Sequence, residues 1–189
     1  MSEGAIVYGG SPTLAGLKTG NLFTCPAPTR QEALETIRKL NRLLVPRGVR
    51  LLVVRFTAQR ALVYLYRPGK LKEDLADREA CRILKERNYP VENVSACVAE
   101  VVRRIGHRKD FPHEVGLFLG YPAEDVDGFI KNHAKSEKCV GTWKVYGDPK
   151  TAQRNFARFE KCSRVYRSCY QKNGKFEKLI VPDRVVSGT

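Results

Sequence analysis

VRLLVVRF (residues 49–56) and RALVYLY (residues 60–66) are the two runs of sequence that decide the fold class. Both are short and rich in β-branched and aromatic residues, which is typical of strands, and the TAQ between them is compatible with a hairpin. The runs are apolar on both faces except at Arg50, Arg55 and Arg60. This pattern predicts a sheet that is covered on both sides, or one with a second face lined by arginine stems.

Helical patterns account for most of the sequence after this hairpin and for the segment before it. Thr29 and Glu32 fit a capping box at the start of a helix that ends near Pro46. Apolar spacing and capping residues predict further helices over residues 71–75, 78–87, 94–106, 122–130 and 149–171. Two apolar runs, Val115–Leu119 and Cys139–Tyr146, are expected to be strands.

These elements predict an α+β fold, with a mixed sheet of about four strands, the first two of them a hairpin, and helices packed on it. Residues 1–28 show little periodicity and are expected to form an N-terminal arm or loop. Residues 29–171 are expected to form one globular domain, and residues 172–189 a C-terminal tail. A length of 189 residues suits such a domain.

Composition favours a soluble cytoplasmic protein. The apolar runs are far too short to span a bilayer, and the N-terminus lacks the layout of a signal peptide. The six cysteines show no CxxC spacing and are expected to be reduced, mostly buried thiols. Three histidines are present, without a ligand pair at a recognised spacing, so no metal site is predicted.

Lysine and arginine exceed aspartate and glutamate by 34 to 20, which gives a net charge of +14. Such an excess attracts nucleic acid, anionic small molecules or acidic partner proteins. Part of it lies on one stripe of the last predicted helix, formed by Arg154, Arg158, Lys161, Arg164 and Arg167. The stripe is either a solvated outer face or a surface for a polyanion.

Three further segments are distinctive in combination: SPTLAGLKTGNLF (11–23), FPHEVGLFLGYPAEDVDGFI (111–130) and GTWKVYGD (141–148), the last followed by a helix that contains KC. Together they resemble an uncharacterised bacterial family, domain of unknown function 3793, over nearly the whole chain. The resemblance implies a bacterial, intracellular and self-contained protein. It implies no activity, cofactor or catalytic residue, because none is established for the family.

The segment FPHEVGLFLGYP is the first candidate site. A glycine turn followed by a helix N-terminus can bind an anion, although Glu124 and Asp125 already complement that end. His113 is a candidate general base and Glu114 a candidate acid or orienting group. Each is also explained by ion pairing or by capping of the sheet end.

Other candidates lie outside that segment. Lys18, in the loop before Gly20, suggests phosphate binding, but GLKTGN does not have the order of a P-loop. Cys25 precedes a predicted helix, where a lowered pKa would make it a nucleophile; the alternative is a half-buried thiol. Lys144 and Tyr146 share one face of a predicted strand and would supply a cation and a phenol beside Gly120 and Tyr121.

The leading hypothesis from these candidates is a small anionic ligand or cofactor of unknown identity, bound in a cleft formed by His113, Glu114, Tyr121, Lys144 and Lys18. Whether the chain is an enzyme is open at this point. The alternatives are a nucleic-acid-binding accessory protein that uses the basic last helix, and a thiol redox or metal-handling protein built on Cys25.

Overall fold

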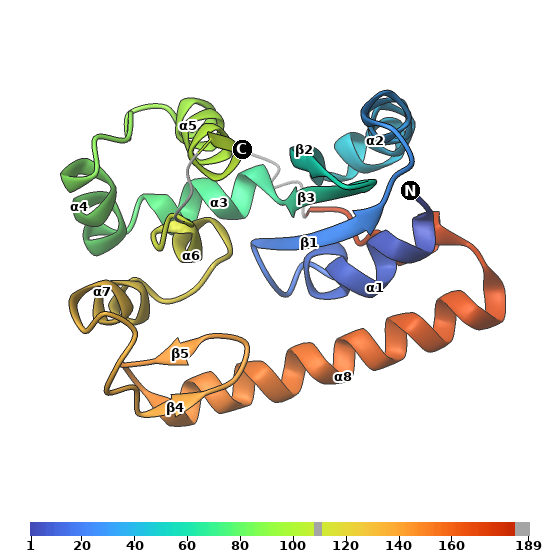
Figure 1. Ribbon diagram of the computed structural model, residues 1–189. Coiled ribbons are helices and arrows are strands. Elements are labelled where there is room, and N and C mark those ends of the chain that lie inside the picture. Colours follow the sequence, from blue (N-terminus) through green and yellow to red (C-terminus); the bar gives the residue numbers. More distant parts are fainter. Residues whose placement is uncertain (108–110, 184–189) are drawn as a thin grey trace, which may run out of the picture. The chain divides into compact units, whose positions relative to one another are not determined.

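The computed structural model describes residues 1–107 and 111–183 (Figure 1). The chain divides into two compact units. The first combines Met1–Gly69 with Cys162–Thr189, and the second is Lys70–Lys161. Each unit has a hydrophobic core of its own. None of the helices in the described part of the chain is long and apolar enough to cross a membrane.

The first unit is built on a three-stranded antiparallel sheet in the order β1-β3-β2. The predicted hairpin is confirmed, because β2 (Arg50–Thr57) pairs with β3 (Arg60–Tyr66). Ala58 and Gln59, between them, have φ values of 47° and 60°, which is the backbone of a type I′ turn. The third strand, β1 (Gly20–Pro26), pairs with the other edge of β3.

Helix α2 (Arg30–Leu44) begins at the predicted cap, where Thr29 Oγ1 accepts a hydrogen bond from the Glu32 amide. It packs on β2 through its apolar face. Asn41 fixes its position, since its amide side chain both donates to and accepts from the Leu51 backbone, at 2.9 and 3.0 Å. A 3₁₀ turn, η1 (Val45–Arg47), then leads into β2.

The expected arm at residues 1–28 is instead α1 (Glu3–Leu14) followed by β1. Helix α1 is buried along most of its length. Its sequence therefore lacks the alternation of polar and apolar faces from which a surface helix is predicted. Gly9 and Gly10 let it approach the sheet closely. A Cβ at these positions would lie 2.2 Å from the Phe23 ring and 2.4 Å from a Leu65 methyl group.

The expected C-terminal tail is in part ordered as well. After α8 (Pro149–Asn173), the 3₁₀ turn η2 (Phe176–Leu179) inserts Phe176 into the core of the first unit. Arg67, which is fully buried, then holds the following residues. Its guanidinium donates to the carbonyls of Thr13, Leu14 and Val181 and pairs with the Asp183 carboxylate.

The second unit is mainly helical. Helices α4 and α7 contact each other, and α7 also contacts β5. The elements of this unit, together with the N-terminal half of α8, are α3 (Pro68–Leu75), α4 (Arg78–Glu86), α5 (Val94–His107), α6 (Val115–Phe118), α7 (Ala123–Lys131), β4 (Cys139–Val140) and β5 (Lys144–Val145).

Two predicted strands in this unit are corrected by the structure. Val115–Leu119 is a helical turn, α6, because a short apolar run fits a buried helix as well as a strand. Cys139–Tyr146 is a small antiparallel hairpin of β4 and β5 rather than one strand. The α+β class is confirmed, with the strands divided between two antiparallel sheets.

Candidate functional site

A cavity of about 390 Å³ lies within the second unit, between α6, α7 and the β4–β5 hairpin. This volume is in the range of pockets that bind small molecules. Its lining is mostly apolar and includes Phe111, Val115, Leu119, Val126, Phe129 and Trp143. His113, Tyr121, Asp125 and Lys144 supply the polar groups of the lining.

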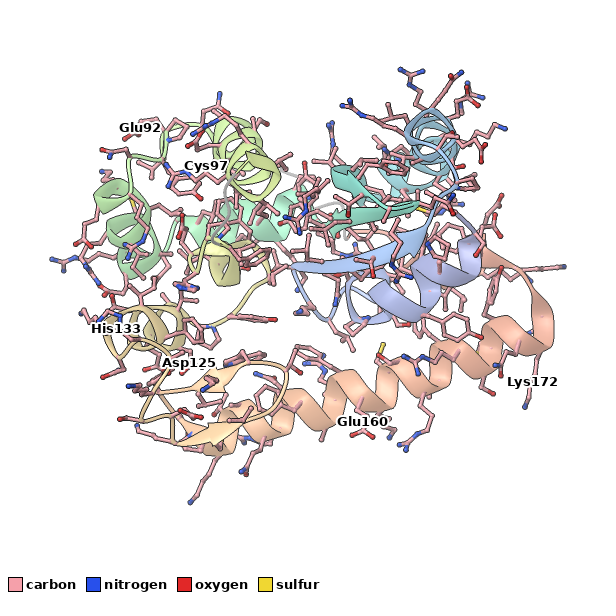
Figure 2. All side chains as sticks on the ribbon, in the orientation of Figure 1. Glu92, Cys97, Asp125, His133, Glu160 and Lys172 are labelled. Carbon is pink, nitrogen blue, oxygen red and sulfur yellow. The ribbon has the colours of Figure 1, made fainter. Side chains whose placement is uncertain are left out.

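Asp125 organises one wall of this pocket. The side chain is only 3% exposed, and its carboxylate accepts three hydrogen bonds. Trp143 Nε1 donates to Oδ2 at 2.6 Å, and the backbone amides of Tyr146 and Gly147 donate to Oδ1 at 2.7 Å each. Asp125, labelled in Figure 2, therefore fastens the hairpin segment to α7 through these three hydrogen bonds.

Aromatic rings line the same wall. The Tyr121 ring stacks on Trp143, with centroids 4.7 Å apart, and Phe156 meets the indole edge-on at 4.6 Å. Gly141 allows this packing, because a Cβ there would lie 2.2 Å from the Phe156 ring. Burial raises the pKa of the Tyr121 phenol, and its hydroxyl donates a hydrogen bond to the Thr142 carbonyl at 3.4 Å.

Lys144 brings a cation to the pocket from β5. Its ammonium donates to the Ala134 carbonyl at 2.7 Å and to the Glu137 carboxylate at 3.0 Å. The ion pair helps to lower the pKa of Glu137, after the larger effect of a backbone hydrogen bond. An ammonium group has three donors, so one donor of Lys144 is left for a ligand beyond these two contacts.

His113 lies at the exposed side of the pocket, in the turn before α6. Its ring meets the Phe129 ring edge-on, with centroids 5.0 Å apart. Neither ring nitrogen forms a hydrogen bond with another described residue, so the imidazole can form hydrogen bonds with a bound molecule.

Glu114 is in a different environment from its neighbour. It is 5% exposed and accepts hydrogen bonds from Tyr89 Oη at 3.0 Å and Arg104 Nη1 at 3.2 Å. Burial and the Glu114 charge raise the pKa of Tyr89, and the Arg104 guanidinium lies 4.0 Å from the centre of the Tyr89 ring. Glu114 is thus part of a buried ionic network, which matches the ion-pair alternative, and it does not line the pocket.

Comparison with protein families assigns the chain. The profile of the family described as "Protein of unknown function (DUF3793)" matches residues 6–180. The chain belongs to this family. The match includes the sheet of the first unit as well as the pocket of the second. No curated protein and no solved structure matches the chain.

The remaining sequence-predicted residues are not among those that line the pocket. Lys18 and Cys25 belong to the first unit, and both are buried. Burial lowers the pKa of Lys18 to about 8 and raises the pKa of Cys25 to about 11. Cys25 lies within β1, so the lowered pKa expected of a nucleophile ahead of a helix is wrong.

Tyr146 follows β5 but does not line the pocket. Its ring packs on α7, where a Cβ on Gly128 would lie 2.5 Å from Tyr146 carbons. Its hydroxyl is buried and has no hydrogen-bond partner among the described residues. Burial raises the pKa of this phenol.

Among the described residues, no cluster of three or more histidine, cysteine and acidic side chains could hold a metal ion. The cysteines are free thiols, buried at Cys25, Cys97 and Cys162 and exposed at Cys169. The five basic residues of the predicted stripe are all exposed on α8.

Asp125 is the main site residue that sequence reasoning missed as such. It was interpreted only as a helix-start acid, yet it lies four residues before Phe129 and next to Val126, on the apolar side of α7. A carboxylate on the apolar face of a helix must accept hydrogen bonds from groups inside the protein. The position of Asp125 on that face therefore indicates that it binds buried donors.

Proposed function

We propose that the chain is a cytoplasmic protein that binds a small acidic ligand with a flat, largely apolar body in the pocket of the second unit. One observation carries the proposal. Aromatic and aliphatic walls meet two basic residues, His113 and Lys144, around a single cavity. Apolar lining with a few converging polar groups is the usual composition of a small-molecule site.

The polar groups favour an anion over a cation or a neutral ligand. The Asp125 carboxylate already accepts three hydrogen bonds, which leaves it little capacity to attract a cation. Lys144 retains a donor for such an anion. A carboxylate or phosphate of the ligand would share the ammonium with Glu137 and accept a hydrogen bond from His113.

The free thiols support the cytoplasmic part of the proposal, since reduced cysteines are typical of reducing compartments. Fractionation of the native host with an antibody to the chain tests the location. Recovery with secreted or membrane-bound proteins would contradict it.

Trp143 provides the experiment for the ligand, because it is the only tryptophan in the sequence and lines the pocket. Two probes of similar shape are 2-naphthoate, which is anionic, and 2-naphthalenemethanol, which is neutral. We expect both to change Trp143 fluorescence, with 2-naphthoate bound more tightly. Lys144→Met should weaken 2-naphthoate at least about tenfold, as for a lost charge-assisted hydrogen bond, and leave the neutral probe unchanged.

Lys138→Met is the matched control. Lys138 precedes β4, and its ammonium also donates to a backbone carbonyl, that of Gly147 at 2.7 Å, but it does not line the pocket. Equal weakening of 2-naphthoate by the two substitutions would contradict the proposal. Trp143 fluorescence that responds to neither probe would contradict it too.

A further inference from the structure

Helix α8 concentrates the positive charge of the chain. Within its 25 residues, seven lysines and arginines accompany one acid, Glu160, for a net charge of +6 out of +14 for the whole sequence. Glu160 and Lys172 are labelled on this helix in Figure 2. The basic residues are Lys150, Arg154, Arg158, Lys161, Arg164, Arg167 and Lys172.

These charges lack ion pairs of the kind that Arg82 forms on α4 and Arg104 on α5. Arg82 pairs with Glu86 at 2.5 Å and also with Glu79, and Arg104 pairs with Glu100 at 2.6 Å. Among the described residues, no lysine or arginine of α8 forms an ion pair. The helix thus presents a row of exposed cations to solvent, and such a row attracts a polyanion.

An exposed aromatic ring lies at one end of this row. From Arg158 to Arg167 the basic residues follow one another at intervals of three. Three residues fall about 60° short of a full helical turn, so the row winds around the axis of α8. The Arg167 guanidinium lies 5.4 Å from the centre of the Tyr8 ring, on α1, and Gln171 Nε2 donates to the Tyr8 hydroxyl at 3.2 Å. Tyr8 is nevertheless 43% exposed, so its ring is oriented by neighbours but still accessible.

We infer that the part of α8 that belongs to the first unit, with the exposed residues Arg164, Arg167 and Lys172, binds single-stranded nucleic acid together with Tyr8. Cations that follow a backbone, combined with an aromatic ring on which an unpaired base can stack, are the two features that such binding surfaces share. Arginine predominates in the row, and its guanidinium suits phosphate oxygens. This part of the helix, residues 162–173, is about 18 Å long, which accommodates a few nucleotides.

The same surface suits a membrane less well. An interfacial helix needs an apolar face to insert beside its basic one. On the exposed side of α8, Val165 is the large apolar residue present among the described positions. An acidic protein would use the cations but has no need of an accessible Tyr8, so Tyr8 separates these partners experimentally.

The test is fluorescence anisotropy of a labelled oligouridine of about 12 nucleotides, titrated with the full chain over a range of salt concentrations. Arg164→Gln with Lys172→Gln should weaken binding at least about tenfold at low salt. A plot of the logarithm of the binding constant against the logarithm of the salt concentration should also become less steep. Its slope should decrease in magnitude by about 1.4, the value for two lost phosphate contacts to a single strand. Arg38→Gln with Lys39→Gln is the matched control, because it removes the same charge from exposed positions of α2 and should change little.

Tyr8→Ala should weaken binding by about fivefold or more, whereas Tyr8→Phe, which keeps the ring, should retain it. Circular dichroism of each variant checks that the helices persist. Three results would overturn the inference: no binding by the unaltered chain at low salt, equal weakening by the α8 and α2 variants, or no effect of Tyr8→Ala. Binding to vesicles containing phosphatidylserine without binding to the oligonucleotide would replace nucleic acid by a membrane surface.

Discussion

Trp143 donates a hydrogen bond from its indole nitrogen to the buried carboxylate of Asp125, at 2.6 Å, and so connects the β4–β5 hairpin segment to α7. The backbone amides of Tyr146 and Gly147 bind the other oxygen of the same carboxylate. Two strands of two residues each have too few ladder bonds to be stable alone. The Asp125 carboxylate therefore supplies three of the hydrogen bonds that hold this pocket wall in place.

Asp125→Ala is expected to lower the free energy of unfolding by about 3 kcal/mol, because three buried donors lose a charged acceptor. Urea denaturation measures the change, and Trp143 emission should shift to longer wavelength as the indole becomes hydrated. Asp127→Ala, on the same helix, removes ion pairs with Arg82 and Lys131 that lie nearer the surface and should cost less than about 1 kcal/mol. A similar loss in both variants would show that Asp125 has no special role.

Arg67→Met is expected to destabilise the first unit by about 3 to 5 kcal/mol. The substitution leaves the buried carbonyls of Thr13, Leu14 and Val181 without their donors and removes the partner of Asp183. Arg67→Lys keeps the positive charge but loses the planar set of guanidinium donors, so its loss of stability should lie between those of the unaltered chain and Arg67→Met. Arg50→Met, at an exposed position of β2, is the control and should change the urea midpoint little. Limited proteolysis should cleave Arg67→Met after residue 175 faster than the unaltered chain.

Much of the fold follows from local sequence signals. Thr29 caps its helix as predicted, and the hairpin of β2 and β3 forms where its two apolar runs are. Helix α1 could not be predicted in the same way. Its glycines and Pro12 argue against a helix locally, and only contact with Phe23 and Leu65, distant in sequence, shows why glycine is needed.

The candidate site could be predicted from the sequence only in part. His113, Tyr121 and Lys144 were expected to share a cleft, and they line one pocket. Glu114 and Lys18 were expected there too. Glu114 is bound by Arg104 and Tyr89, and Lys18 belongs to the first unit. Sequence order indicates which residue types are near a turn, but the partner of a buried charge is set by tertiary packing.

Cysteine reactivity gives a prediction about the thiols. Cys25 is fully buried and burial raises its pKa to about 11, so iodoacetamide at pH 8 should not modify it in the folded chain. Cys169, which is exposed on α8, should be modified within minutes. Mass spectrometry of peptides from native and urea-unfolded protein measures both. Rapid modification of Cys25 in the native chain would restore the hypothesis of a reactive thiol.

Lys18 should make stability depend on pH. Burial lowers its pKa to about 8 from the ordinary 10.5, so the folded chain loses this proton at a lower pH than the unfolded chain does. Between these values the unfolded state binds more protons, and the contribution of Lys18 to stability therefore rises with pH. Below about pH 8 the full cost of burying the charged ammonium is present.

Lys18→Met removes this titration. The free energy of unfolding of the variant minus that of the unaltered chain should therefore fall by about 2 to 3 kcal/mol between pH 7 and pH 10. Urea denaturation at a series of pH values measures the difference, and effects of tyrosine ionisation common to both proteins cancel. Lys39→Met, at an exposed position of α2, should give a difference that does not change with pH. A flat profile for Lys18→Met would mean that Lys18 retains its proton in the folded chain through this range.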